Sequence, residues 1–151
     1  LLAGVDGGAA LVSFVGHSST DRWDFQPLLS VADVADLGNA GRPALFLQWG
    51  CWNSYAYDPA YESLSSRLLL EPGVGAAGTV GATTLTADRV HDRLAIHFYR
   101  ALREGEATTL GEALREAKLR LRAEGAASDD VLLGVAILGD PASTLPAQDG
   151  D

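Results

Sequence analysis

Two side chains that can act together in catalysis, His17 and Cys51, each come directly after a glycine at the end of an apolar segment. Such segments are typical of parallel strands buried on both faces, and open α/β sheets carry their chemistry at the carboxyl ends of these strands. A lone cysteine is more often a small buried hydrophobic residue, and a lone histidine a hydrogen-bonded polar one. Their matching positions at strand ends indicate instead a nucleophile and its proton-transfer partner.

Four short apolar segments, each bounded by Gly, Pro or Asp, have the character of strands. They are Ala10–Val15, Ala44–Trp49, Val74–Ala82 and Val131–Leu138. Helical patterns lie between them, and alternating strands and helices favour a parallel sheet with right-handed crossovers. We therefore expect an α/β fold, a three-layer α/β/α sandwich with a mostly parallel sheet whose four strands are neighbours in sequence order.

Capping and stop signals predict the helices between these strands. The expected helices are Ser30–Leu37, Tyr61–Leu70, one from a Thr86 cap to Gly105, and one from a Thr109 cap to Gly125. Thr109 and Glu112 together make a capping-box pattern, in which each side chain bonds the backbone of the other residue.

The composition bounds the class of protein. The chain has 151 residues, of which 47% are hydrophobic and 21% charged, as expected for one soluble globular domain. No apolar stretch approaches the length of a membrane span, and no charged-then-apolar leader opens the chain. The net charge of −9 disfavours nucleic acid and anionic membranes as partners, because their phosphates would be repelled. A single cysteine excludes an internal disulfide.

The two ends of the chain carry separate expectations. The sequence opens at Leu1 as though partway through an element, and the strand Ala10–Val15 follows almost at once. We expect N-terminal strands to be missing, so that the outer edge of this strand is bare or is paired with an upstream segment or another chain. Residues 1–145 would form this partial domain, and the polar residues 146–151 a flexible tail.

An ordered set of motifs along most of the chain resembles one known family. The motifs are Val12–Ser19, Trp23, Asn39–Pro43, Gly50-Cys51, Val74–Gly81, Phe98-Tyr99, Thr109–Leu114 with Lys118, and Leu138–Pro141. Together they are similar to the gingipain-like cysteine peptidases, the C25 family of the caspase-like group. The resemblance implies a caspase-like fold, hydrolysis of a protein or peptide substrate, and a secreted or cell-surface location. We expect no cofactor and no metal.

By this resemblance, Cys51 is the nucleophile of an endopeptidase and His17 is its catalytic partner. Cys51 would attack the scissile carbonyl to give an acyl-enzyme, while His17 would donate a proton to the leaving amine and later activate water. The backbone N–H groups of Ser18 and Cys51 would hold the oxyanion. The family has glycine in place of Ser18, and the third catalytic acid of some members has no counterpart here.

The resemblance also assigns substrate contacts, each of which has a structural alternative. Trp23 would wall the active site or pack over a loop, and Asn53 would orient a substrate carbonyl or cap the following loop. Thr83, Thr84 and Asp88 would line the pocket for the P1 side chain, which precedes the scissile bond. Asp88 would suit a basic P1 residue, but it equally suits the first turn of a helix, where the dipole favours an acid.

Two other kinds of site fit the sequence poorly. A serine nucleophile elbow at Gly16-His17-Ser18 would need a glycine where Thr20 stands and a helix directly afterwards. His91 and His97 are six positions apart and diverge around a helix, which argues against a zinc site.

Two alternative functions stay open. One is a CHAT or separase-like cysteine protease, which would use the same Cys–His mechanism and would be cytoplasmic. The other is a catalytically inactive caspase-like module with a role in recognition or assembly, which is favoured by Ser18 and by the missing N-terminal strands.

Overall fold

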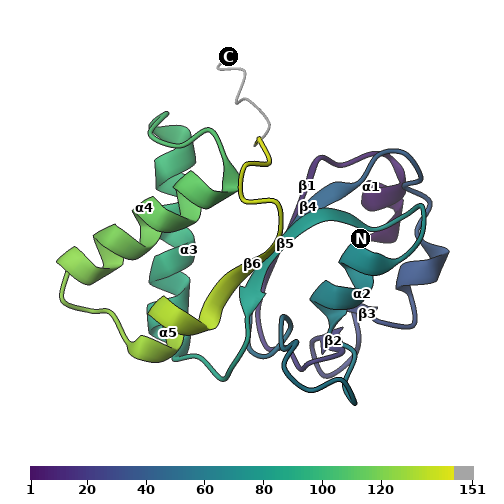
Figure 1. Ribbon diagram of the computed structural model, residues 1–151, viewed down its shortest axis with the longest axis horizontal. Coiled ribbons are helices and arrows are strands. Elements are labelled where there is room, and N and C mark those ends of the chain that lie inside the picture. The colour runs from purple at the N-terminus through teal and green to yellow at the C-terminus, as the bar shows by residue number, and fades with distance from the viewer. Residues whose placement is uncertain (145–151) are drawn as a thin grey trace.

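A four-stranded sheet runs through the middle of the computed structural model, which describes residues 1–144 (Figure 1). Its strands are β1 (Leu11–Val15), β4 (Ala44–Trp49), β5 (Ala76–Ala82) and β6 (Val135–Gly139), which are neighbours in that order. β1, β4 and β5 run parallel to one another, whereas β6 runs antiparallel to β5. The expected mostly parallel sheet with its strands in sequence order is confirmed.

One face of the sheet is covered by helices from the second half of the chain. These are α3 (Asp88–Arg103), α4 (Leu110–Ala123) and α5 (Asp129–Gly134). In Figure 1 they lie to the left of the sheet. Their buried side chains form a hydrophobic cluster with the sheet, to which β4 contributes Leu45, Leu47 and Trp49.

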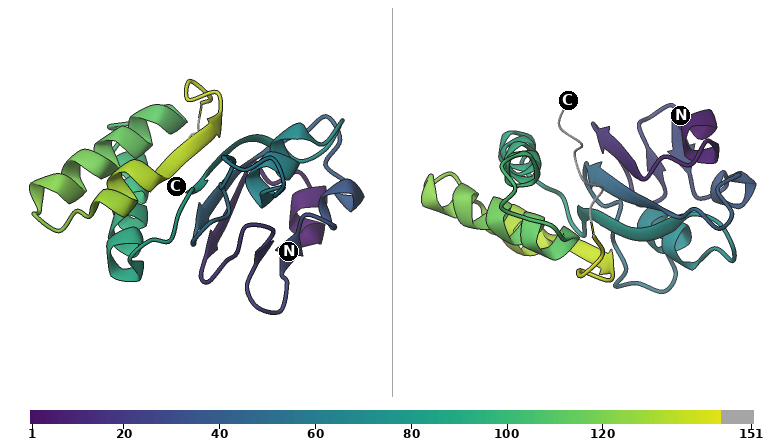
Figure 2. Two further views of the ribbon diagram at one scale, coloured as in Figure 1. Left: turned by 60° about the horizontal axis from the view of Figure 1, so that its bottom comes forward. Right: turned by 90° about the horizontal axis from the view of Figure 1, so that it is seen from above.

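The opposite face is covered by segments from the first half of the chain. These are α1 (Leu2–Asp6), a hairpin of β2 (Arg22–Trp23) and β3 (Leu29–Ser30), a 3-10 turn η1 (Val34–Asp36), and α2 (Leu64–Leu70). They share a second hydrophobic cluster with the other side of the sheet, to which β4 contributes Ala44 and Phe46. The sheet therefore lies between two layers, as Figure 2 shows from two further directions, and the α/β/α expectation is confirmed.

β4 is the most deeply buried strand, and its bounds are those that the sequence predicts. All six of its residues are buried, because alternate side chains enter the two hydrophobic clusters. Gln48 is its one polar side chain. The Gln48 amide oxygen accepts from Trp23 Nε1 at 2.8 Å, and its nitrogen donates to Ser65 Oγ at 2.6 Å. Both ends of the buried amide are thus satisfied.

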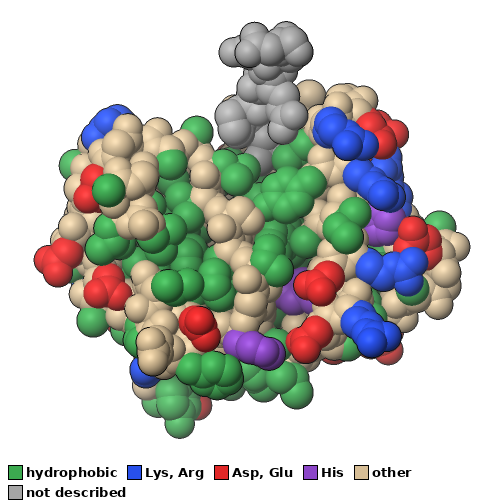
Figure 3. All heavy atoms as spheres, turned by 180° about the vertical axis from the view of Figure 1, so that it is seen from behind, with side chains coloured by type: hydrophobic (Ala, Val, Ile, Leu, Met, Phe, Trp, Pro, Cys, Tyr) green, Lys and Arg blue, Asp and Glu red, His purple; other side chains and the backbone are tan. Residues whose placement is uncertain are grey.

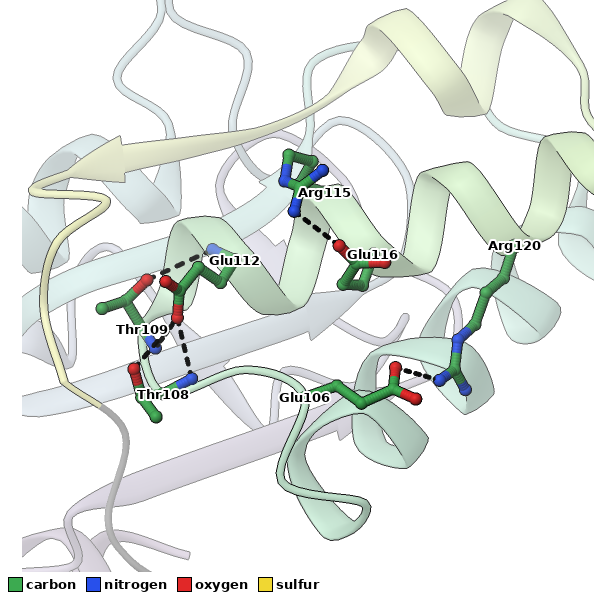
Figure 4. Close-up of polar contacts among 7 residues, drawn as sticks. All are labelled: Glu106, Thr108, Thr109, Glu112, Arg115, Glu116 and Arg120. Carbon is green, nitrogen blue, oxygen red and sulfur yellow. Dashed lines mark hydrogen bonds and ion pairs between the residues drawn. The ribbon is translucent and has the colours of Figure 1, made fainter.

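The start of α4 has the capping box that the sequence predicts (Figure 4). The Thr109 hydroxyl accepts from the Glu112 backbone N–H at 3.2 Å, and the Glu112 carboxylate accepts from the N–H groups of Thr108 and Thr109 at 2.9 and 3.1 Å. These backbone donors, the Thr108 N–H foremost, lower the pKa of Glu112. Further along α4, Arg120 pairs with Glu106 from the loop before it.

The expected strand Val131–Leu138 is wrong over its first half. α5 occupies Asp129–Gly134, and β6 begins only at Val135. An apolar run by itself does not distinguish a buried helix from a strand. Asp129 and Asp130 in the first turn of α5 favour the helix, because acids interact well with the N-terminal end of the helix dipole.

The expected helix Ser30–Leu37 is also wrong. Ser30 belongs to β3, and the Asp33 carboxylate accepts from both the Ser30 N–H and the Ser30 hydroxyl, at 2.8 and 2.7 Å. Only Val34–Asp36 forms a short 3-10 turn. Local hydrogen bonds of this kind compete with a regular helix, and here they fix a turn.

β1 lies at one end of the sheet, and within residues 1–144 it pairs only with β4. Val15, its last residue, is 61% exposed. This arrangement agrees with the expectation that the outer edge of the first strand is bare in this chain.

Two further expectations concern the ends of the chain and the membrane. Across residues 1–144, none of the helices has the length and apolar character that a membrane crossing requires. The flexible tail expected over 146–151 lies outside the described residues, so the domain boundary at 145 stays a prediction.

Candidate active site

The sheet brings His17 and Cys51 to the same edge. β1 ends at Val15 and β4 at Trp49, and these two residues are register partners in the parallel pair. The Gly16 N–H continues the ladder by donating to the Trp49 carbonyl at 3.2 Å. His17 and Cys51 therefore leave the sheet side by side, at the carboxyl ends of neighbouring strands, as the sequence predicts.

A short hydrogen-bond chain ties the loop after β1 to the loop after β4. The Ser18 hydroxyl donates to the Cys51 carbonyl at 2.7 Å and accepts from Asn53 Nδ2 at 3.1 Å. The two loops approach closely at Gly50, where a Cβ would lie 2.3 Å from Ser18 Oγ and 2.6 Å from the Gly16 carbonyl oxygen. A glycine before Cys51 is thus needed because the two loops pack too closely for any side chain at this position.

The chain turns sharply directly after Cys51. Trp52 has a φ of 64°, a left-handed conformation that is uncommon for residues other than glycine. The Trp52 N–H donates to the Thr84 carbonyl at 3.1 Å, and the Ser54 N–H donates to the Ala82 carbonyl at 2.9 Å. These bonds to the end of β5 hold the turn in its strained conformation.

Two cavities meet at the pair, and both are lined by His17 and Cys51. The larger, about 640 Å³, also has Phe25, Trp52 and Leu85 in its wall. Asp21 is one of the charged residues in its wall. The pKa of Asp21 is lowered to about 2, mainly because the Arg22 guanidinium donates hydrogen bonds to its carboxylate and also because the Ser19 hydroxyl does so.

The smaller cavity, about 240 Å³, lies between the strand ends and the start of α3. Asp88 and Asp92 are its acidic side chains, and among the described residues neither of them forms an ion pair. Seen from behind, the molecule has histidine and acidic side chains next to one another in its lower half, with hydrophobic ones below them (Figure 3). Each cavity beside the pair therefore presents two carboxylates, Asp21 and Asp24 in the larger and Asp88 and Asp92 in the smaller.

The Cys51 thiol is partly buried, and its polar neighbour is Thr86. Cys51 Sγ lies 3.4 Å from Thr86 Oγ1 and 3.8 Å from the Thr86 carbonyl oxygen. Sequence reasoning assigns Thr86 as the cap of α3, but the helix begins at Asp88, its N-cap is Ala87, and no side chain caps it. A threonine just before an amphipathic helix is compatible both with a helix cap and with a contact to the cysteine, so the sequence pattern does not distinguish these two roles.

The structure places Trp23 in the core, so its assignment to the wall of the active site is corrected. Its side chain is 1% exposed, stacks on Phe14 at a centroid distance of 4.7 Å, and donates to Gln48. It lines neither of the two cavities. The alternative, that Trp23 packs over a loop, agrees better with this position, in which the side chain holds the β2–β3 hairpin against the sheet.

Asn53 is also fully buried, and its side chain supports the site from beneath. Its amide nitrogen donates to Ser18 Oγ and to the Gly50 carbonyl, and its oxygen accepts from the Ala82 N–H at 3.1 Å. Since every one of these partners belongs to the protein and the side chain has no exposed surface, the assignment of Asn53 to a substrate carbonyl is corrected to a structural one.

The three residues expected around the P1 side chain separate in the structure. Thr83 Oγ1 donates to the Gly134 carbonyl at 2.9 Å, and Thr84 packs against the same glycine. Neither threonine lines the two cavities at His17. Asp88 does line the smaller one, and it also stands in the first turn of α3, so both of the roles considered for it are compatible with its position.

The chain belongs to peptidase family C25. The model of that family, described as Peptidase family C25, matches residues 1–146, which confirms the resemblance carried by the sequence motifs. The fold matches the caspase-like α/β domain of solved members of this family. A comparison with curated proteins finds no match.

Solved structures share the fold at low sequence identity. The crystal structure of the Arg-specific cysteine proteinase gingipain R (RgpB) superposes with a TM-score of 0.78 at 16% identity, over 97% of this chain and 35% of that one. The complex of Porphyromonas gingivalis RgpB pro- and mature domains gives 0.83 at 16% identity, over 97% and 36% of the two chains. A third structure, described only as a protease, gives 0.75 at 12% identity. This chain thus spans about a third of the length of the gingipain chains that it matches.

Proposed function

We propose that the chain is part of a cysteine endopeptidase in which Cys51 is the nucleophile and His17 its catalytic partner. The observation that carries this proposal is the position of the two side chains, which leave neighbouring parallel strands at one edge of the sheet and line the same two cavities. Membership of a peptidase family supports the same reaction. Residues 1–145 would form part of the peptidase domain.

The proposed reaction needs a proton acceptor, a nucleophile and an oxyanion site. The Cys51 thiol gives its proton to the His17 imidazole, and the thiolate attacks the scissile carbonyl carbon. The C–N bond then breaks as His17 protonates the leaving amine, and water hydrolyses the resulting thioester. Within residues 1–144, the backbone N–H groups of Ser18 and Cys51 donate to no other group of the protein, so they are free to bind the oxyanion.

The two cavities suggest how a peptide is placed across the pair. The smaller cavity presents two carboxylates, Asp88 and Asp92, and it would accept a basic side chain at P1. The larger cavity combines the apolar side chains of Phe25, Trp52 and Leu85 with charged ones, so it would accept a side chain that has an apolar stem and a polar end. The substrate class that fits is therefore a peptide with a basic residue at P1.

A labelling experiment tests this proposal. The full chain is treated with a peptidyl electrophile that has a basic P1 residue, and the mass of the adduct is mapped. Covalent labelling at Cys51 is expected, and it is lost in Cys51→Ala and slowed in His17→Gln. If iodoacetamide reacts with Cys51 while the peptidyl reagent never does, the inactive recognition module becomes the better account of this chain.

The bare edge of β1 has its own proposed partner. We propose that a strand from elsewhere in the same polypeptide, or from another chain, pairs with this edge, because unpaired strands normally are covered. Concentration-dependent self-association of the 151-residue chain in analytical ultracentrifugation is the expected result. A monomer at all concentrations with slow exchange of the β1 amide protons contradicts it. By family resemblance, the complete protein would work at the cell surface or outside the cell.

A further inference from the structure

A second histidine is linked to the Cys51 thiol through a threonine. Cys51 Sγ lies 3.4 Å from Thr86 Oγ1, and the same hydroxyl oxygen lies 3.0 Å from His91 Nδ1. Thr86 is 5% exposed and His91 is 3% exposed, so both partners are held away from bulk water. The Thr86 hydroxyl makes no capping bond to α3, which leaves the thiol and the imidazole as its partners.

The surroundings of His91 keep its ring neutral. Burial is the main cause that lowers the pKa of His91 to about 4, against a smaller opposing effect of Asp92, Asp130 and Asp88. The ring is also held in place by an edge-to-face contact with Trp49 at a centroid distance of 5.8 Å. A neutral imidazole carries one N–H, which stands on either Nδ1 or Nε2.

The position of that proton follows from the unpaired nitrogen. His91 Nε2 is buried and has no hydrogen-bond partner among the described residues. A buried N–H without an acceptor is costly and rare in proteins, whereas an unpaired acceptor is better tolerated. The favoured tautomer therefore has its proton on Nδ1, from which it donates to Thr86 Oγ1. The Thr86 hydroxyl then has its own proton free for the sulfur.

We propose that His91 and Thr86 form a donor chain, from His91 Nδ1–H to Thr86 Oγ1–H to Cys51 Sγ, that orients the sulfur and stabilises its thiolate. Both are positioning residues, since neither transfers a proton to the substrate. The inference rests on the proposed function of Cys51, and it assigns the two residues that prepare the nucleophile while His17 takes and returns the proton. A hydrogen bond to an ionised group is stronger than one to a neutral group, so the donor chain acts chiefly on the thiolate that attacks the substrate.

The first test observes the tautomer without any need for activity. The full chain is labelled with ¹⁵N-histidine, and long-range proton–nitrogen correlation spectra are recorded at about pH 7. His91 is expected to show a protonated Nδ1 and an unprotonated Nε2. A proton on Nε2, or rapid exchange between the two tautomers, overturns the proposal.

The second test measures the reactivity of the sulfur with iodoacetamide as a function of pH. Thr86→Val keeps the shape of the side chain and removes the hydroxyl, and we expect alkylation of Cys51 about tenfold slower near neutral pH. Thr86→Ser, the matched control, keeps the hydroxyl and is expected to stay within about twofold of wild type. The wild-type advantage should be lost, and should tend to reverse, at a pH at which the thiol is fully ionised in every variant, because a hydrogen-bonded thiolate is the weaker nucleophile. A ratio of rates that stays constant with pH indicates a steric role and overturns the proposal.

A pair of His91 variants keeps the test decisive if Thr86→Val fails to fold. His91→Asn retains an N–H near the position of Nδ1, whereas His91→Leu removes it. Alkylation is expected to be slower in His91→Leu than in His91→Asn, and equal rates count against the donor chain. Alkylation requires no peptide hydrolysis, so these outcomes are independent of whether the chain cleaves or binds a peptide.

Discussion

The burial of His91 makes the stability of the protein depend on pH in a defined direction. In the unfolded chain, His91 takes up a proton near its ordinary pKa of 6.5, but in the folded protein it does so only near pH 4. Between these values the unfolded state binds more protons than the folded state, so acidification favours unfolding. The free energy of unfolding should therefore fall as the pH drops from about 6.5 to about 4.

The magnitude follows from the size of that interval. At 1.36 kcal/mol for each pKa unit, the contribution of His91 is about 3 kcal/mol between the two ends of the range. This is a large share of the 5–15 kcal/mol that typically stabilises a domain. The pKa of about 4 already includes the opposing effect of the three nearby carboxylates, Asp92, Asp130 and Asp88, which raise the pKa of the ring.

Urea unfolding followed by tryptophan fluorescence measures the effect. The free energy of unfolding is determined for wild type and for His91→Phe at several pH values from about 7 to about 4. The variant will have a different stability at neutral pH, so the compared quantity is the loss on acidification. Wild type should lose about 3 kcal/mol more than the variant, because all other titrating groups are shared. Equal losses in the two proteins would refute the reasoning.

Three further substitutions test the packing and the hydrogen bonds that hold the site. Gln48→Leu leaves the buried Trp23 indole N–H without a partner and removes one of the two hydrogen bonds of the Ser65 hydroxyl, so it should lower the free energy of unfolding by about 2 kcal/mol in urea. Thr109→Ala removes the capping hydroxyl of α4, and it should cost about 1 kcal/mol, whereas serine there should restore most of it in thermal melts. Gly50→Ala places a Cβ 2.3 Å from Ser18 Oγ, and a loss of about 1 to 3 kcal/mol is expected in urea, while Gly4→Ala, with nothing within 4 Å, serves as the control. Unchanged stability in any of the first three variants contradicts the contact that it removes or crowds.

The sequence predicts those elements whose local signals agree with their tertiary surroundings. The segment Ala44–Trp49 is apolar because both of its faces are buried, and Pro43 and Gly50 mark its ends. The capping box at Thr109 satisfies backbone groups within one turn, so it needs no distant partner. The edge that gathers His17 and Cys51 follows from two parallel strands alone.

The remaining features depend on contacts that are distant in sequence. The hairpin strands β2 and β3 have two residues each, too few for a periodic pattern, and Trp23 is fixed by Gln48 and Phe14. Thr86 and Cys51 are 35 positions apart in the sequence, so their contact is formed only by the fold. From the sequence, a threonine just before a helix predicts a helix cap, but in the structure its hydroxyl contacts the Cys51 sulfur. For the same reason, the sequence does not distinguish an Asn53 that contacts substrate from one that is buried beneath the loops.

The buried amide of Gln48 also determines how far β4 can be displaced along its neighbours. Side chains alternate along a strand, so a slip by one residue would move Gln48 to the opposite face of the sheet and bring Trp49 into its place. The indole of Trp23 would then lose its partner in the interior, and the hydroxyl of Ser65 would keep only its bond to Ser54. Every alternative alignment of β4 is penalised in this way, whereas a wholly aliphatic strand would tolerate several. Cys51 follows Gln48 by three residues, so by fixing the alignment of β4 the Gln48 amide also fixes how far the Cys51 sulfur lies beyond the carboxyl end of the sheet.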